Sequence, residues 1–257
     1  MIENFLTPEN IKFSKALENF MTKWGYVEQF RHLAAVSIPE AHEYYSRYLR
    51  GVFETMKPGG ELGTVLIDPE EFFRNGNPEQ VAVHTAKRCI DNALNVVDTA
   101  SLIFGHSLLD GLINQYIEII ESIDQDVFVD RIKDAKVKLS SILEGDVQQI
   151  IQNRVAAHVK GLQRESVIKR CDFLHEICQP TDDAKRMGEY KFDRDRLRKL
   201  DDARHNIIHE PNILGKTETL RDDLDYLTRT GMYFLKIMHY KYDLKIISGV
   251  DRFTGSN

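Results

Sequence analysis

Hydrophobic residues recur at steps of three and four along nearly the whole chain, which is the period of an amphipathic α-helix. The pattern predicts helices over residues 78–123, 127–143, 146–178, 193–209 and 219–242. The last of these has the clearest stripe, made of Leu220, Leu224, Leu227, Phe234 and Met238. Short connections between long amphipathic helices favour an antiparallel bundle. The sequence therefore predicts an all-α protein with a bundle architecture.

The segment from Pro78 to Ile123 is longer than a typical globular helix. It either spans the bundle as one rod or breaks between Asp91 and Asp98 or at Gly105.

Three prolines each follow a residue that favours a helix N-cap, and proline suits the first helical position. They predict helix starts at Pro8, Pro69 and Pro78. Residues 57–63 form the strongest cluster of helix breakers, and residues 64–67 after them could form one short strand.

The length of 257 residues suggests one main domain that carries an extension. We expect a mostly helical N-terminal extension over residues 1–77, whose role the sequence does not indicate. A helical bundle should follow over residues 78–247, and residues 248–257 should form a frayed tail.

The composition is that of an ordinary globular protein, with 42% hydrophobic and 29% charged residues. A net charge of -6 argues against a protein that coats nucleic acid through bulk electrostatics. Between Lys185 and Arg204, however, eight basic residues stand against five acidic ones. This run indicates either a solvated helix face with alternating charges or a phosphate-binding stripe.

Three cysteines, Cys89, Cys171 and Cys178, include no CxxC pair and imply no disulfide framework. The N-terminus lacks the pattern of a signal peptide, and nowhere do 18 apolar residues run uninterrupted. We therefore expect a cytoplasmic protein with no membrane association.

One stretch carries the residue types of phosphodiester chemistry: Arg204-His205-Asn206-Ile207-Ile208-His209, shortly before Pro211. Arginine suits phosphate oxygens, and histidine exchanges protons near neutral pH. On an ideal helix a five-residue step rotates by about 140°, which separates Arg204 from His209. Because Pro211 disfavours a helical residue before it, a distorted last turn could bring the two side chains together.

So short a pattern also arises by chance, and Arg170-Cys171-Asp172-Phe173-Leu174-His175 has the same spacing. This second copy lies inside the predicted continuous helix 146–178, whereas the first lies at a helix end, where side chains can converge. The context therefore favours Arg204 to His209.

The stretch from Arg204 to His209 resembles the Arg-polar-x-x-x-His motif of HEPN domains, all-helical domains found in many RNA-cleaving toxins and defence effectors. Residues 92–120 resemble the earlier core helix of these domains, and the helix order is similar as well. The resemblance covers roughly residues 78–245.

The resemblance implies a HEPN-like bundle acting as a metal-independent endoribonuclease. The protein would form a homodimer that joins both motifs in one cleft, with no cofactor. In that scheme His209 exchanges protons with the RNA 2′-hydroxyl or the leaving 5′-oxygen. Arg204 holds the scissile phosphate, and His205 orients the phosphate or the partner. Further contacts to RNA are expected from Asn206, Arg198 and Lys199. A toxin or antiviral role, with an antitoxin or regulatory protein as partner, follows by analogy.

Simpler interpretations of the motif stay open. His209 could cap the helix C-terminus. Arg204 could pair with Asp201 or Glu210 on the surface. His205 and His209 could bind a metal with a nearby aspartate, although no HExxH motif is present.

Other candidates are more simply explained by packing. We expect His106 to be a buried, hydrogen-bonded residue, and Asp110 to be a solvated or capping carboxylate. Cys171, His175 and Cys178 should pack in the core rather than bind a metal. A non-catalytic HEPN-like module that binds RNA or nucleotide or mediates dimerisation, and an unrelated structural bundle, remain as alternatives.

Overall fold

The computed structural model is all-α, as the hydrophobic period predicts. It describes residues 6–55, 78–132, 147–178, 190–209 and 220–247. These residues form seven α-helices and no strand. The predicted short strand at 64–67, the helix start at Pro69 and the tail from 248 lie outside the described residues.

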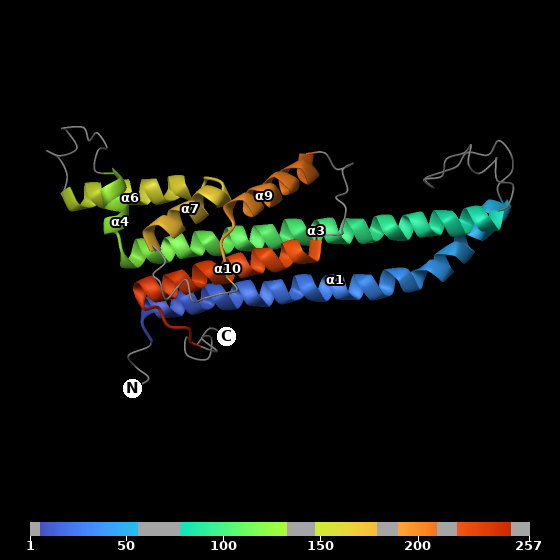
Figure 1. The fold of residues 1–257 in the computed structure, drawn as a ribbon, viewed down its shortest axis with the longest axis horizontal. Coiled ribbons are helices and arrows are strands. Elements are labelled where there is room, and N and C mark those ends of the chain that lie inside the picture. The colour runs from blue at the N-terminus through green and yellow to red at the C-terminus, as the bar shows by residue number, and fades with distance from the viewer. Residues whose placement is uncertain (1–5, 56–77, 133–146, 179–189, 210–219, 248–257) are drawn as a thin grey trace.

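Two long helices, α1 (Pro8–Thr55) and α3 (Pro78–Ile123), run antiparallel as a hairpin whose far end projects past the other helices (Figure 1). Their 48 and 46 residues correspond to rods of about 70 Å at 1.5 Å per residue. Of the two possibilities that the sequence left open for residues 78–123, one rod or a broken helix, the structure shows the single rod. The far end has a small core of its own, formed by Leu49, Val81, Ala82 and Ala86.

Helix α3 continues through Gly105 without a break. The glycine has a packing role, because its missing side chain allows other helices to approach closely. A Cβ at this position would lie 2.9 Å from Leu224 Cδ2 and 3.1 Å from the Trp24 ring. Glycine thus lets α1 and α10 (Leu220–Tyr242) pack closely against the same segment of α3.

The first helix belongs to the main hydrophobic core. Its Phe13, Phe20 and Trp24 are buried in one cluster with Tyr116 of α3 and Phe234 of α10. The segment predicted as an N-terminal extension therefore begins with a helix that completes the core of the bundle.

Four shorter helices lie along the side of α3 that faces away from α1 (Figure 1). They are α4 (Asp126–Ile132), α6 (Val147–Leu162), α7 (Val167–Cys178) and α9 (Arg194–His209). Buried Phe128, Val155 and Phe173 continue the core beneath them. This layer brings α7 and α9, which carry the two Arg-to-His stretches, against α3.

The prediction of a single helix over 146–178 is wrong, because residues 163–166 interrupt it. The Arg164 amide donates to the Gly161 carbonyl at 3.1 Å, which tightens the last turn of α6. Ser166 Oγ then accepts the Lys169 amide at 3.4 Å, as an N-cap residue does. Arg170 consequently lies near the start of α7 rather than deep inside a long helix.

One helix in the described part of the chain, Glu79–Ile123 of α3, is long and apolar enough to cross a membrane by length and composition alone. Core helices of soluble proteins pass the same test. In this fold Leu109, Ile113 and Ile117 of α3 are fully buried in the main core.

Candidate active site

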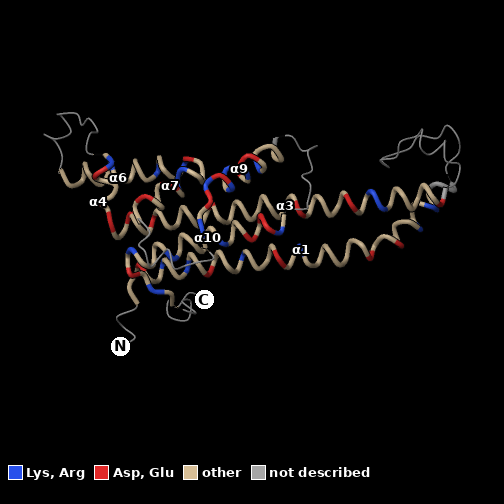
Figure 2. The backbone as a smooth tube through the Cα atoms, viewed as in Figure 1, with Lys and Arg blue, Asp and Glu red and all other residues tan. Residues whose placement is uncertain are grey.

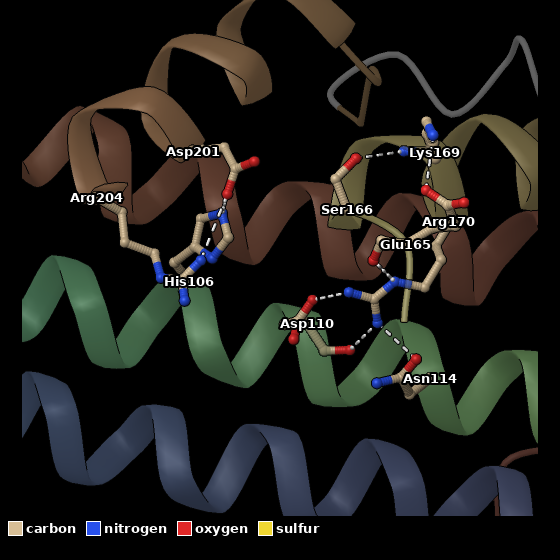
Figure 3. Close-up of polar contacts among 9 residues, drawn as sticks. All are labelled: His106, Asp110, Asn114, Glu165, Ser166, Lys169, Arg170, Asp201 and Arg204. Atoms are coloured by element: carbon tan, nitrogen blue, oxygen red, sulfur yellow. Dashed lines mark hydrogen bonds and ion pairs between the residues drawn. The ribbon is translucent and has the colours of Figure 1, made fainter. Parts of the chain in front are cut away.

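A group of polar side chains, here called the polar cluster, lies where α7 and α9 pack on α3 (Figure 3). Its members are His106, Asp110 and Asn114 of α3, Arg170 of α7, and Asp201 and Arg204 of α9. The three residues of α3 are spaced by four, so they share one face of the helix.

His106 is the most buried member of the cluster, with 1% of its surface exposed. Its Nε2 lies 3.1 Å from Asp201 Oδ1, within ion-pair distance. The angles do not make this contact a hydrogen bond, and neither ring nitrogen has a hydrogen-bond partner among the described residues. Burial lowers the pKa of His106; Asp201 opposes this effect and Arg204 reinforces it. The predicted burial of His106 is confirmed, whereas its predicted hydrogen bond is not found.

Arg204 points from α9 toward α3 and pairs loosely with Asp201 (Figure 3). Its Nη1 lies 3.5 Å from Asp201 Oδ1, and 36% of the side chain is exposed. Its Nε is buried without a hydrogen-bond partner in the described part of the chain. The alternative pairing with Asp201 is therefore found, and it leaves about a third of the arginine accessible.

Arg170, in contrast, is 3% exposed and its hydrogen-bonding capacity is used within the fold. Its Nε donates to the Glu165 carbonyl at 3.0 Å and its Nη1 to Asn114 Oδ1 at 2.5 Å. Its Nη2 donates to Asp110 Oδ1. The Asp110 side chain is 40% exposed, as expected of a solvated carboxylate, but it also pairs with Arg170 and so joins α3 to α7.

The two Arg-to-His stretches thus differ for a reason that the sequence did not provide. The continuous helix predicted over 146–178 places Arg170 in its interior, yet in the structure a helix start lies just before it. What separates the two arginines is bonding: Arg170 is buried and fully paired, and Arg204 is partly exposed. His175 also has a structural contact, with its Nδ1 2.7 Å from the Tyr233 hydroxyl.

The spacing of Cys171, His175 and Cys178 does not produce a metal site in the described part of the chain, where no group of three ligating side chains occurs. Burial raises the pKa of the Cys171 thiol, and that of Cys178 to about 12. A raised pKa disfavours the thiolate that binds metals.

The remaining predicted site residues lie outside the polar cluster. His205 and Asn206 are exposed on α9, as are Arg198 and Lys199 about one to two turns earlier. His209 is the last residue of α9, and its side chain lies outside the described part of the structure.

The distorted last turn that Pro211 made possible is not found, because α9 remains α-helical through His209. Positions 204 and 209 on a regular helix point in directions about 140° apart. A single copy of α9 therefore does not aim both positions at one point.

The basic run before the motif is partly used in ion pairs between helices. Arg194 bonds to Asp172 at 2.9 Å, and Arg196 to Asp223 at 3.0 Å. Acidic and basic residues are interspersed along α9 (Figure 2). Within the described residues this surface matches the alternating-charge interpretation better than a uniform phosphate-binding stripe.

Sequence reasoning missed the contact between His106 and Asp201 and the role of Arg170. A signal was present, because residues 106, 110 and 114 place three polar groups on one face of a mostly apolar stretch of the helix. Polar groups in a buried stripe need partners, and these come from other helices.

In comparisons with known proteins, no family model, no curated protein and no solved structure matches this chain.

Proposed function

We propose that the protein is a metal-independent endoribonuclease of the HEPN type, with Arg204 and His209 as its central residues. The observation that carries the proposal is the placement of Arg204. Its partly exposed side chain lies over the polar residues of α3, five residues before the end of α9. The Arg204 side chain can therefore bind a phosphate from its present position on α9.

The chemistry needs few protein groups. His209 takes the proton of an RNA 2′-hydroxyl, and the oxygen attacks the adjacent phosphorus. The bond from phosphorus to the 5′-oxygen breaks, and the departing oxygen receives a proton. Arg204 stabilises the negative charge that develops on the phosphate. The products are a 2′,3′-cyclic phosphate and a free 5′-hydroxyl.

The regular geometry of α9 favours a site shared between two copies. Positions 204 and 209 of one helix point in directions about 140° apart. One phosphate can therefore contact an arginine and a histidine more readily if Arg204 comes from one chain and His209 from a second. We therefore propose a homodimer in which Arg204 of one copy and His209 of the other face the same RNA. His205 would orient the phosphate, and Asn206, Arg198 and Lys199 would contact the flanking nucleotides.

Unrestrained RNA cleavage would harm the cell that makes the protein. A cytoplasmic toxin or antiviral effector, kept inactive by an antitoxin or regulatory protein, is the biological role that we propose with this activity.

Purified protein should cleave RNA in the presence of a chelator and leave 2′,3′-cyclic phosphate ends. The His209→Ala and Arg204→Ala proteins should lose cleavage. His32→Ala on α1 and Arg154→Ala on α6 serve as matched controls and should retain it, because both lie on other helices and outside the polar cluster. Unchanged cleavage by the His209→Ala and Arg204→Ala proteins would exclude this assignment.

A second candidate is an HEPN-like module that binds RNA or nucleotide without cleaving it. It is favoured by the pairing of Arg204 with Asp201 and by the undistorted last turn of α9. This candidate predicts binding that weakens in Arg204→Ala but persists in His209→Ala, with no turnover by the unmodified protein.

A further inference from the structure

One carboxylate oxygen of the polar cluster has two cationic or protonatable neighbours. Asp201 Oδ1 lies 3.1 Å from His106 Nε2 and 3.5 Å from Arg204 Nη1. The two neighbours differ in their surroundings, because His106 is 1% exposed and the Arg204 side chain is 36% exposed.

The other charged groups near His106 are already matched to each other. Asp110 of α3 pairs with Arg170 of α7. At the adjacent Gly105, α1 and α10 contribute the apolar side chains of Trp24 and Leu224. The charge state of His106 therefore acts mainly on Asp201 and Arg204.

We propose that His106 is a positioning residue, and that a proton gained by its ring moves the Asp201 carboxylate from Arg204 to His106, freeing Arg204 for a phosphate anion. This inference rests on the proposed function, because it concerns the availability of the same Arg204.

The reason for this direction is electrostatic. A protonated His106 would be a buried cation that needs the nearest carboxylate, and attraction between charges is stronger where water is excluded. Arg204 can exchange its carboxylate for water or phosphate, because it is partly exposed. His106 has no such alternative, since both of its ring nitrogens lack hydrogen-bond partners among the described residues.

The same geometry implies reciprocal coupling between the proton and the phosphate. Burial and Arg204 both lower the pKa of His106, so the resting protein holds the ring neutral. An anion bound at Arg204 offsets the arginine charge and raises that pKa. Thermodynamic linkage then requires that protonation of His106 strengthens anion binding by the same factor.

The first test uses no RNA. The titration midpoint of the His106 ring is measured by NMR in the unmodified protein and in the Arg204→Gln and Asp201→Asn proteins. Arg204→Gln should move the midpoint to higher pH, and Asp201→Asn to lower pH. A midpoint that stays in place in both variants would overturn the proposal. These changes are made at partly exposed residues, so the buried ring is left intact.

The second test measures binding of a 2′-fluoro RNA oligonucleotide, which lacks the attacking hydroxyl, against pH at fixed ionic strength. Affinity should rise as the pH falls through the His106 midpoint, by roughly fivefold or more. His106→Gln should remove this part of the pH dependence, and His106→Asn provides a second variant should the first not fold. Any contribution of His205 and His209 remains in both variants, so the difference isolates His106.

His158→Gln on α6 is the matched control. Burial also lowers the pKa of His158, but this residue lies outside the polar cluster, and the pH dependence of binding should be retained. Asp201→Asn should bind at high pH as tightly as the unmodified protein does at low pH. Equal pH profiles for the unmodified and His106→Gln proteins, or weaker binding by Asp201→Asn at every pH, would refute the proposal. If RNA binding depends on His106 protonation but the unmodified protein does not cleave RNA, only the proposed ribonuclease function is rejected.

Discussion

Arg170 of α7 donates a hydrogen bond of 2.5 Å to Asn114 Oδ1 of α3, and through this contact and its pairing with Asp110 it joins the two helices. Both partners come from residues far away in the chain. Asn114 and Asp110 lie on the same face of α3 as His106, above which α9 presents Arg204 (Figure 3).

Replacing Arg170 with methionine should destabilise the protein by about 2–4 kcal/mol. The change removes several hydrogen bonds of a buried cation and leaves its partners unpaired. The free energy of unfolding in urea measures the loss. Arg164→Met, in the exposed turn before α7, is the control and should change stability by less than about 0.5 kcal/mol. Equal stability of the two variants would show that Arg170 does not hold α3 and α7 together.

Two glycines of α3 should respond oppositely to alanine. A Cβ at Gly105 would lie 2.9 Å from Leu224 Cδ2, so overpacking should cost about 1–3 kcal/mol. A Cβ at Gly111 meets no atom within 4 Å, so Gly111→Ala should stabilise the helix by about 0.5–1 kcal/mol. Thermal unfolding of both variants tests the close packing of α1 and α10 on α3. A gain in stability for Gly105→Ala would contradict it.

Stability should fall in mildly acidic solution partly because of His106. Its folded-state pKa is lowered by burial, so the unfolded chain takes up a proton first as the pH drops below about 6.5. The stabilising contribution of the neutral ring is therefore complete above this pH, and it declines until the folded-state pKa is reached. Between pH 7 and pH 5, the unmodified protein should lose more unfolding free energy than His106→Gln. Parallel curves for the two proteins would rule out this contribution.

The three cysteines should differ in their reaction with iodoacetamide. Cys171 and Cys178 are buried and have raised pKa values, about 12 for Cys178, whereas Cys89 is partly exposed. At pH 8, Cys89 should be alkylated well before the other two, because the thiolate is the reacting form. Mass spectrometry of peptides over time gives the order, and in denaturant the three rates should converge. Early labelling of Cys178 in the native protein would conflict with its burial.

The helices were predictable because their signal is local. The apolar period placed helices at 193–209 and 219–242, and the structure has Arg194–His209 and Leu220–Tyr242. The interruption at 163–166 escaped prediction, because the same period continues on both sides and the turn depends on single hydrogen bonds at Gly161 and Ser166.

The sequence by itself determined the helical class, the helical pattern over residues 78–123 and the suitability of the Arg204 side chain for phosphate. Each of these depends on spacing within one segment or on the chemistry of one side chain. Only the tertiary structure decided that Arg170 is structural, that Arg204 is partly exposed, and that Asp201 lies between Arg204 and His106. The physical reason is that burial and charge pairing are set by side chains of α3, α7 and α9. Packing brings these side chains together from positions 60 to almost 100 residues apart.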